Sequence, residues 1–376
     1  MSESYSGGTP SVGVKEYYGG QIPFIRSAEI NSEITELFLT EEGLKNSSAR
    51  LVAVGDILYA LYGATSGEVG RARLKGAINQ AILAIKPHTD YDSEYLAQWL
   101  RKSKHSIIDT YLQGGQGNLS GTIVKELSVD FPSLKEQKAI GGFFRQLDNL
   151  ITLHQRKYDK LQVLKKAMLE KMFPKNGSSV PEIRFKGFTD AWEQRKLGDN
   201  IVEYTEVTTE NNQYPPLTSS RKGIFLQTEY FAGNQIASDD NTGYNIVPYG
   251  YFTYRHMSDD EVFHFNINDI VEKGIVSTLY PVFTTDENLD SRYLQYQLNY
   301  GHEFAKFAIL QKQGGSRTYM YLNKLRQLHL TMPNHVEEQK AISSFFMNLD
   351  HLITLHQREL EKLQNIKKSM LEKMFV

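Results

Sequence analysis

The feature that most constrains this chain is a long segment that occurs twice. Residues 136–173 and 338–375 align without a gap at an offset of 202, and 27 of the 38 positions are identical. The stretches before the two copies match only at scattered positions, such as Gly76 opposite Gly274 and Gln113 opposite Gln313. Two units of this size are too few and too large for a solenoid. The sequence therefore predicts two divergent globular parts, each followed by a nearly invariant segment.

The repeated segment is predicted to be one long helix. It contains no proline, and its apolar residues recur at alternating steps of four and three, a period of 3.5 residues. That period is typical of a helix that packs along another helix. At 1.5 Å per residue the segment would span roughly 57 Å. The expected seam consists of Ile140, Phe144, Leu147, Ile151, His154 and Leu161 in the first copy, and of Ile342, Phe346, Leu349, Ile353, His356 and Leu363 in the second.

A single helix cannot bury such a stripe, and the obvious partner is its own repeat. We therefore expect the two helices to pack antiparallel as a coiled coil with internal pseudo-twofold symmetry. Two seam positions are polar in both copies, namely His154/His356 and Lys165/Lys367. Buried polar seam residues can fix the register of a coiled coil, and we hypothesise that the histidines do so. The alternative is a partly exposed histidine at a loose part of the seam, and a metal role for the pair is disfavoured.

The two globular parts alternate short apolar runs with glycine-rich turns. The first part has such runs at 22–25, 50–63 and 78–87, and a helix is expected over 93–109. The second part has them at 223–231, 249–255 and 274–283, and a helix is expected over 291–309. Each part is predicted to be a small α+β domain with a mixed or antiparallel sheet. The expected divisions are 1–130 for the first domain, 131–175 for the first helix, 176–197 for a connector, 198–331 for the second domain and 332–376 for the second helix.

Several segments carry a family resemblance. Residues 132–140 (PSLKEQKAI) and 169–174 (LEKMFP) resemble the conserved region of specificity subunits of type I restriction–modification systems. Residues 181–199 (PEIRFKGFTDAWEQRKLGD) resemble the segment that opens a target-recognition domain in that family. Residues 7–11 (GGTPS), 16–30 and 55–67 resemble the first part of such a domain. The resemblance covers essentially the whole chain, and the duplicated order of domain and helix is itself distinctive.

One segment departs from the family pattern. Both halves usually start with a segment like 181–199, whereas the first half here begins at GGTPS, and residue 1 falls opposite about residue 200. Either the start has been trimmed or one connector is enough. In a ring of two domains and two helices, a missing connector is expected to loosen closure and so to affect stability rather than specificity.

The resemblance implies sequence-specific binding of double-stranded DNA without catalysis. Each domain would read one half of a bipartite target, and the helices would set the spacing between the halves. Inserting one helical turn between Gln162 and Val163 is therefore expected to change the spacing. The chemistry would sit on partners: two methyltransferase subunits that bind S-adenosylmethionine and modify adenine, and restriction/translocase subunits that use ATP and Mg.

Those partners would dock on exposed helix positions that are identical in both copies. Two equivalent faces would bind two methyltransferase subunits. The candidates are Gln155, Arg156, Lys166 and Lys171, repeated as Gln357, Arg358, Lys368 and Lys373.

The candidate DNA contacts are amide, hydroxyl, aromatic and guanidinium side chains in loops, because such groups read base edges where the backbone can approach phosphate. The alternative for each is an ordinary glycine-rich turn. Alanine at Arg317 or Gln116 is expected to relax specificity in one half-site only. The candidates are Arg26, Ser27, Tyr62, Thr65, Ser66, Asn79, Gln80, Gln113, Gln116 and Asn118 in the first domain, and Ser219, Ser220, Arg221, Lys222, Tyr254, Arg255, Gln313, Ser316, Arg317 and Tyr319 in the second.

Composition excludes several other classes. There is no cysteine and no HExxH spacing, so neither a disulfide framework nor a common zinc site is expected. The first residues lack an apolar core and no run approaches a membrane span, which predicts a cytoplasmic protein with no membrane partner. The formal net charge of −2 is low for a DNA binder that acts alone, so partners are expected to supply phosphate contacts.

No catalytic motif is apparent in the sequence. It has no phosphate-binding loop, and Tyr214-Pro215-Pro216-Leu217 lacks the flanking residues of an adenine methyltransferase motif. Two other classes stay open at this point. One is a coiled-coil scaffold without DNA recognition, and the other is a stand-alone enzyme with an unrecognised site.

Overall fold

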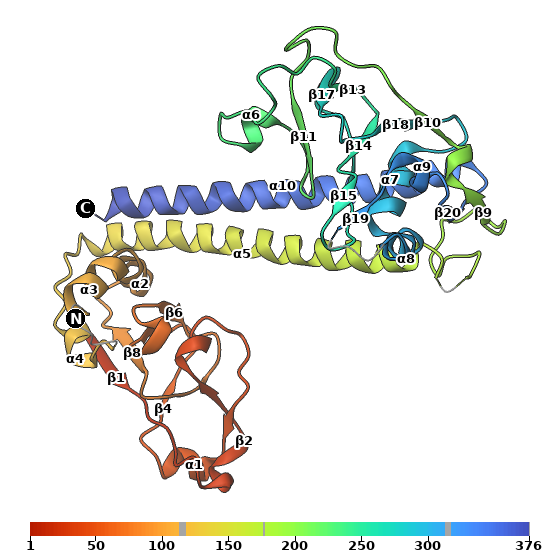
Figure 1. The fold of residues 1–376 in the computed structure, drawn as a ribbon. Coiled ribbons are helices and arrows are strands. Elements are labelled where there is room, and N and C mark those ends of the chain that lie inside the picture. The colour runs from red at the N-terminus through yellow and green to blue at the C-terminus, as the bar shows by residue number, and fades with distance from the viewer. Residues whose placement is uncertain (113–117, 176, 313–316, 376) are drawn as a thin grey trace. The chain divides into compact units, whose positions relative to one another are not determined.

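The computed structural model describes residues 1–112, 118–175, 177–312 and 317–375. The chain divides into two compact units: unit 1 comprises Met1–Lys157 and His356–Val376, and unit 2 comprises Tyr158–Leu355. Each unit holds one α+β domain together with one part of each long helix (Figure 1). These helices are α5 (Leu134–Lys171) and α10 (Val336–Met374), of 38 and 39 residues. The prediction of two long helices and two α+β domains is confirmed.

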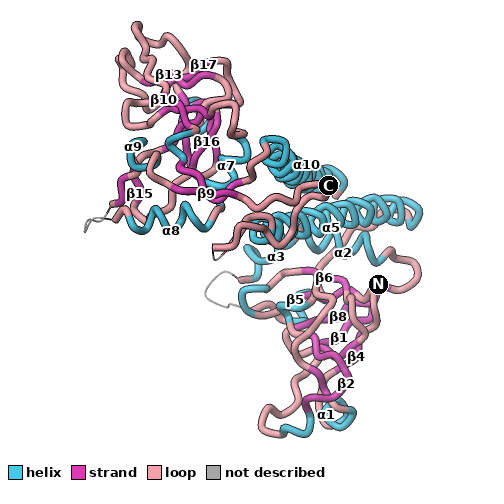
Figure 2. Tube along the Cα trace, turned by 90° about the vertical axis from the view of Figure 1, so that its right-hand side faces the viewer, coloured by secondary structure: helices cyan, strands magenta, loops and turns pink. Residues whose placement is uncertain are grey.

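The domain of unit 1 contains two four-stranded sheets. The first has the order β1-β8-β5-β6 and is antiparallel throughout, with bounds Ser2–Ser6, Ile82–Pro87, Ile57–Ala60 and Val69–Arg71. The second has the order β3-β2-β7-β4, with bounds Phe38–Leu39, Tyr18–Ile25, Gly76–Ile78 and Arg50–Val52. It is mixed, because β2 pairs with β7 in parallel. Figure 2 shows the two sheets one after the other, with α1 (Glu41–Lys45) at the far end.

Three helices cover the first sheet of unit 1: α2 (Ser93–Lys102), α3 (Lys104–Tyr111) and α4 (Gly121–Lys125). The single helix expected over 93–109 is therefore wrong, because the chain turns at Ser103 and starts a new helix. Leu96 and Leu100 of α2 and Ile107 of α3 still lie on one buried cluster with Ile57, which explains why a single periodicity ran through both helices.

The domain of unit 2 repeats the first sheet of unit 1. Its four-stranded sheet has the order β10-β18-β14-β16, with bounds Ile201–Glu203, Val282–Thr285, Phe252–Tyr254 and Phe265–Ile267. The remaining strands form two-stranded pairs: β11 (Leu217–Ser220) with β12 (Gly223–Leu226), β13 (Asn245–Pro248) with β17 (Lys273–Val276), β15 (Met257–Ser258) with β19 (Thr318–Tyr319), and β20 (His329–Met332) with β9 (Glu193–Lys196). The structural differences between the two domains thus lie mainly outside one shared antiparallel sheet.

The helices of unit 2 follow the same plan. They are α6 (Gln227–Tyr230), α7 (Ser291–Tyr300), α8 (His302–Leu310) and α9 (Leu322–Leu325). The single helix expected over 291–309 is wrong, since Gly301 adopts an extended conformation (φ −75°, ψ 139°) and separates α7 from α8. Tyr293 and Leu294 of α7 and Phe304 of α8 are buried in one core with Phe252 and Phe283 of the sheet.

In unit 1, the first part of α5 packs antiparallel against the last part of α10. Phe144 stacks on Phe375 with ring centroids 5.8 Å apart, and Lys367 Nζ donates to Asp148 Oδ1 at 2.5 Å. Residue numbers rise along one helix while they fall along the other, which defines the antiparallel direction. Ile140 and Leu147 complete the buried seam.

In unit 2, the other parts of the same helices pack in the same way. Phe173 stacks on Phe346 (6.0 Å), and Lys165 Nζ bonds Asp350 Oδ1 at 2.5 Å. Each of these contacts is the unit 1 contact shifted by 202 residues, so the predicted internal twofold relation holds for the seam. The polar seam lysines are thereby explained, since each has an aspartate of the opposite helix as its partner.

Most predicted seam residues near the middle of α5 and of α10 are less buried than those closer to the helix ends. Phe144, Phe346, Ile342 and Leu349 are buried, but six predicted seam residues are only partly so: Ile151, His154, Leu161, Ile353, His356 and Leu363. The two histidines nevertheless contact each other within unit 1, with Nδ1 atoms 3.0 Å apart.

Candidate nucleic-acid interface

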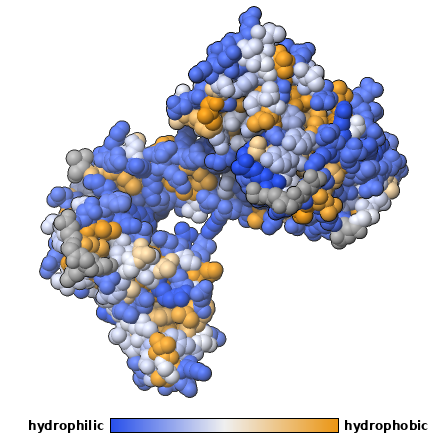
Figure 3. Space-filling view, in the orientation of Figure 1, coloured by the Kyte–Doolittle hydropathy of each residue, from blue (hydrophilic) through white to orange (hydrophobic). Residues whose placement is uncertain are grey.

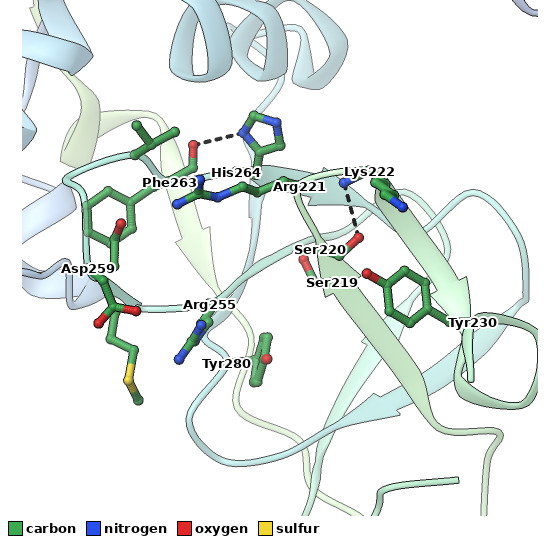
Figure 4. Close-up of a pocket in the computed structure, with 13 residues that line it drawn as sticks. Ser219, Ser220, Arg221, Lys222, Tyr230, Arg255, Asp259, Phe263, His264 and Tyr280 are labelled. Atoms are coloured by element: carbon green, nitrogen blue, oxygen red, sulfur yellow. Dashed lines mark hydrogen bonds between the residues drawn. The ribbon is translucent and has the colours of Figure 1, made fainter. Parts of the chain in front are cut away.

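A concave site in unit 2 brings several predicted contact residues together (Figure 4). The cavity has a volume of about 390 Å³. Its walls come from the hairpin β11–β12, the segment from β14 to β15, and the loop that enters β16. The lining residues are Ser219, Ser220, Arg221, Lys222, Tyr230, Arg255, Met257, Ser258, Asp259, Val262, Phe263, His264 and Tyr280.

The hairpin turn presents two basic side chains. Ser220 Oγ donates to Gly223 O (3.1 Å) and accepts from Lys222 N (3.1 Å), which fixes the turn. Gly223 adopts φ +124°, a conformation that favours glycine. Arg221 forms an ion pair with Asp260, whereas Lys222 is exposed and its ammonium has no partner within the described residues. The hairpin therefore holds one neutralised and one free cation.

Arg255 is a second free cation at this site. It lies between Tyr254 and His256, which are both buried, so its own side chain points outward. Tyr254 Oη donates to Met320 O (2.9 Å), and Met320 N donates to His256 O (2.7 Å). The backbone that carries Arg255 is thus held on both sides. Its guanidinium makes no hydrogen bond or ion pair in the described part of the chain.

Two aspartates hold the other arginines of this region. Asp260 accepts hydrogen bonds from Arg221 and from Ser258 Oγ (2.8 Å), and these bonds keep its pKa below the usual range. Asp259 accepts from Arg317 Nε at 2.9 Å. Asp260 therefore stays ionised at neutral pH, and both Arg221 and Arg317 are paired in the free protein.

Two predicted contacts of the second domain are corrected by the structure. Tyr254 is completely buried, and its hydroxyl is used by Met320 O. Ser219 is 7 % exposed and bonds to Thr253 O (3.1 Å) and Asn266 Nδ2 (2.9 Å). Neither side chain is available to a base edge. Gln313 and Ser316 lie outside the described residues.

Tyr319 keeps an exposed face. It is 37 % exposed in β19 and stacks on Tyr321 with ring centroids 5.9 Å apart. His256 lies 5.1 Å from Tyr321, so the three rings form one aromatic group.

The candidates of unit 1 fall into two groups. Arg26 and Asn79 follow the paired residues Ile25 and Ile78 of β2 and β7, so they leave the sheet at the same edge. Ser27 begins the short turn next to Arg26, and Gln80 Oε1 accepts from Thr9 Oγ1 at 2.5 Å. Arg26 is held by Glu29 and Glu36, which raise its pKa.

The second group surrounds the turn at 62–67. Tyr62 is 38 % exposed and forms a bridge with Asn118, whose Oδ1 accepts from Gly63 N at 3.3 Å. Thr65 Oγ1 donates to Tyr62 O (3.3 Å). Ser66 was a wrong choice for a base contact, because it is 7 % exposed and its hydroxyl donates to Leu61 O (3.1 Å). Gln113 and Gln116 lie outside the described residues.

Eight lining residues of the unit 2 cavity were not among the predicted contacts, and they include the ring side chains of Tyr230, His264 and Tyr280. These three come from α6, the loop before β16 and the loop after β17, and no motif links them. Tyr280 has a raised pKa because of its burial, and the charge of nearby Arg255 acts in the opposite direction. Figure 4 shows this tyrosine beside Arg255.

The exposed faces of the long helices carry repeated leucines. Leu150 and Leu153 of α5 are 43 % and 47 % exposed, and their counterparts Leu352 and Leu355 of α10 are 39 % and 44 % exposed. Surface hydrophobic residues that stand singly are ordinary, but here the same pair is exposed in both copies of the repeat. Figure 3 shows hydrophobic residues amid a largely hydrophilic surface.

The predicted polar docking positions lie on the same helices. Gln155, Arg156, Lys166, Lys171, Gln357, Arg358, Lys368 and Lys373 are all exposed. Arg156 Nη2 donates to Glu33 Oε1 at 2.7 Å, so its guanidinium is already used within unit 1. Lys171 Nζ lies 4.0 Å from Glu182 Oε2, and Gln357 Nε2 donates to Glu361 Oε1 at 3.3 Å.

Two absences concern only the described residues. No group of three His, Asp or Glu side chains there is placed to hold a metal ion. None of their helices is long and apolar enough to cross a membrane.

Comparison with known proteins gives one consistent result. The type I restriction modification DNA specificity domain matches residues 1–163 and again 189–365. The MjaVIII specificity subunit of Methanocaldococcus jannaschii, a type I restriction enzyme subunit, is 23 % identical and is aligned over 97 % of this chain and 88 % of its own length. The MjaIX specificity subunit of the same organism is 28 % identical over 64 % of this chain and 60 % of its own length.

The fold agrees with a solved structure of the same kind. The S subunit of a type I restriction–modification system from M. genitalium covers all of this chain and 96 % of its own, with a TM-score of 0.63 and 13 % identity. At that identity the likeness concerns the fold alone. The two matches of the family domain cover both units, and on that ground the chain belongs to the type I restriction–modification DNA specificity family.

Proposed function

We propose that each domain reads one half of a bipartite DNA target and that the long helices fix the distance between the halves. The observation that carries this proposal is the concave site of unit 2, where two free cations stand among polar and aromatic side chains. Free guanidinium and ammonium groups are what base edges and phosphates attract. The divergence of the two domains suits two unrelated half-sites.

Within that site we assign base reading to Arg255. Its backbone is fixed on both sides, and a guanidinium held in this way can donate two hydrogen bonds to guanine O6 and N7. Lys222, at the tip of the hairpin, suits a phosphate contact. Arg221 and Arg317 become available only if DNA displaces Asp260 and Asp259, so they are weaker candidates for the same role.

In unit 1 the equivalent role falls to the turn that carries Tyr62 and Thr65, together with Asn118. An asparagine side chain suits adenine, to which it can bond at N6 and N7. Asn118 Oδ1 already bonds Gly63 N, so its amide nitrogen remains the group that would face DNA.

The long helices suit a role as spacer. A helix of 38 residues spans roughly 57 Å, and half-sites one DNA turn apart are separated by roughly 34 Å.

The exposed leucines suit a second role, the docking of methyltransferase subunits. Unit 1 offers Leu150 and Leu153, and unit 2 offers Leu352 and Leu355, so two like partners would find the same face twice. The polar positions that are repeated around them would complete each interface.

The reactions themselves belong to those partners in this proposal. S-adenosylmethionine, ATP and Mg would be bound by the modification and restriction/translocase subunits, which act on adenine and on the DNA backbone. The assembly would work in the cytoplasm, where its DNA is found.

The direct test is methylome sequencing of a host that expresses this chain with its cognate methyltransferase subunit. A methylated motif of two short specified parts around an unspecified spacer is expected. A continuous motif, or methylation that is independent of this chain, would contradict the proposal.

A further inference from the structure

Three consecutive acidic residues follow β15 in unit 2, and each of them pairs with a cation from a different segment. We call residues 259–261 the acidic loop. Its pairs are Asp259 with Arg317, Asp260 with Arg221, and Glu261 with Lys312. The first pair joins Oδ1 to Nε at 2.9 Å, and the third joins Oε1 to Nζ at 2.5 Å. The three cations come from the segment that enters β19, from the turn of the hairpin β11–β12 and from the segment after α8.

The acidic loop is held in a defined conformation by its own backbone. Asp260 Oδ1 accepts from Ser258 Oγ at 2.8 Å and from Val262 N at 3.3 Å. Glu261 adopts φ +59°, a conformation that few residues other than glycine adopt. Such residues persist where the surrounding structure holds them, and they cluster at functional sites. The three carboxylates are therefore presented in a fixed arrangement.

The paired side chains remain open to solvent at the cavity of unit 2. Asp259 and Arg221 line that cavity together with Lys222 and Arg255. In the pair of Asp260 with Arg221, the side chains are 50 % and 58 % exposed. Ion pairs this exposed contribute little to stability, because water solvates both charges. A competing anion can therefore displace the carboxylates while the domain stays folded.

DNA phosphate is an anion of the matching chemistry. A carboxylate and a phosphate both present oxygen atoms that a guanidinium can bind with two parallel hydrogen bonds. Sequence-independent binding to DNA depends almost wholly on such contacts between cations and phosphates. A cation that leaves a carboxylate for a phosphate loses one ionic contact as it gains another. Lys222 and Arg255, which are free, carry no such cost.

The domain of unit 1 has the same arrangement on an unrelated loop. The segment between β2 and β3 carries three glutamates, and they hold three arginines. The glutamates are Glu29, Glu33 and Glu36, and the arginines are Arg26, Arg73 and Arg156. This segment is not the counterpart of the acidic loop in the internal repeat. Because the shared fold does not dictate the arrangement, its presence in both domains favours a shared functional reason.

We propose that the acidic loop, residues 259–261, is a built-in competitor of DNA phosphate that limits sequence-independent binding by holding Arg221, Lys312 and Arg317. A DNA segment gains from these cations only after it displaces the carboxylates, whereas Arg255 is available to base edges at once. The loop thereby gives base contacts more weight in the choice of a target, because specificity is a difference between two affinities. This inference rests on the proposed function of the cavity and gives the loop a role in selectivity.

The test is fluorescence anisotropy of the full chain with a labelled duplex of random sequence. At about 50 mM salt, Asp260→Asn is expected to bind at least about threefold tighter than the unaltered chain, because Arg221 is released for a phosphate. The asparagine keeps the Oδ1 atom that accepts from Ser258 and Val262. Asp199→Asn removes an exposed acid of unit 2 that does not line the cavity, and it is the control of equal net charge with affinity unchanged.

The salt dependence and a second substitution test whether the acid acts through its cation. For Asp260→Asn, the slope of log binding constant against log salt concentration should steepen by about one. Its advantage should therefore fall about threefold between about 50 and 200 mM salt. In an Arg221→Ala background, Asp260→Asn should have no more effect than Asp199→Asn. Asp259→Asn with Arg317→Ala repeats the comparison at the neighbouring pair should Asp260→Asn alter the fold.

Three results would overturn the role of the acidic loop. One is equal affinity of Asp260→Asn and Asp199→Asn, and another is failure of every variant to bind the duplex at low salt. The third is a gain that persists in the Arg221→Ala background, since the carboxylate would then act on DNA by repulsion alone. The methylated motif judges the proposed function separately. A bipartite motif with equal affinities refutes only the role of the loop, whereas a continuous motif refutes the proposed function whatever the affinities.

Discussion

The imidazole rings of His154 and His356 meet within unit 1, with their Nδ1 atoms 3.0 Å apart. The two residues are related by the internal offset of 202, so each ring faces its own counterpart. One Nδ1 must donate and the other accept, which requires at least one neutral ring. The polar contact sits where the apolar seam is loosest, and it supplies a specific pairing there.

The first prediction is a pH dependence of unit 1. Burial, together with the charges of His154 and Lys157, lowers the pKa of His356 in the folded protein. The unfolded chain, with an ordinary histidine pKa of about 6.5, then binds more protons below that pH than the folded chain does. The free energy of unfolding should therefore fall as the pH drops below about 6.5 and be indifferent to this group above it.

Urea unfolding at pH 7.5 and 5.5, followed by fluorescence of Trp99 in a Trp192→Phe background, measures this effect. The double variant His154→Leu, His356→Leu should lose that part of the pH dependence. An unchanged dependence in the double variant would show that other groups cause it.

The second prediction contrasts two neighbouring glycines of α5. A Cβ at Gly141 would lie 2.4 Å from Asp92 Oδ1, the atom that caps α2, whereas a Cβ at Gly142 would meet nothing within 4 Å. Gly141→Ala should therefore destabilise unit 1 by about 1–3 kcal/mol, as an overpacked site does. Gly142→Ala should stabilise it by about 0.5–1 kcal/mol through helix propensity. Thermal unfolding of the two variants measures both effects. Equal shifts of the same sign in the midpoint temperature would refute the close packing of Gly141 against Asp92.

The sequence predicted the helices far better than the domains. A gapless repeat with a 3.5-residue period leaves little choice of structure, and α5 and α10 follow it closely. The split at Gly301 was missed because glycine is tolerated in a helix and the apolar pattern continues across it.

The contact residues were only partly predictable for a related reason. All three residues of β14 are buried, so the alternation that separates inner from outer faces in an exposed sheet fails at Tyr254. Arg255 was correctly placed at the surface because a guanidinium is rarely buried without a partner. Tyr230, His264 and Tyr280 converge only through the fold, so no local pattern could indicate them.

The third prediction compares Glu338 with Glu136, its counterpart at the offset of 202. Glu338 is completely buried and forms an ion pair with Arg184, whereas Glu136 is exposed. Glu338→Gln leaves Arg184, which is 12 % exposed, without its charged partner and should destabilise unit 2 by about 2–4 kcal/mol. Glu136→Gln alters an exposed group and should change the stability of unit 1 by no more than about 0.5 kcal/mol. Hydrogen exchange in the first turns of α5 and α10 measures both effects. A comparable loss of stability in both units would mean that Glu136 also has a structural partner.

The fourth prediction separates base reading from phosphate binding at the unit 2 cavity. Arg255→Ala should relax the methylated motif at one position of one half-site, with a loss of about 1–3 kcal/mol in discrimination. Lys222→Ala should weaken binding to all sequences alike. It should also reduce the slope of log binding constant against log salt concentration by about one. Lys306→Ala, which removes an exposed lysine of α8 outside the cavity, is the control. If Arg255→Ala leaves both the motif and DNA binding unaltered, Arg255 is excluded as the base-reading residue. The proposed function of the chain would still stand.

The fifth prediction concerns the spacer. An insertion between Gln162 and Val163 alone would separate Leu161 from Lys165 inside unit 2, so the structure favours a different place. Unit 1 ends between Lys157 and Tyr158 on α5 and begins again between Leu355 and His356 on α10. Both points lie close to the contact between His154 and His356. Seven residues inserted at both points preserve the 3.5-residue seam and add about 10.5 Å of helix.

At about 3.4 Å per base pair, that addition corresponds to about three base pairs, and the methylome should show the unspecified spacer lengthened by that amount while both half-sites stay the same. The matched control is the same insertion in one helix only. It shifts the seam residues of one helix against those of the other and should abolish methylation. If the double insertion supports full methylation with the original spacer, the helices do not set the distance. The spacing would then have to come from the partner subunits.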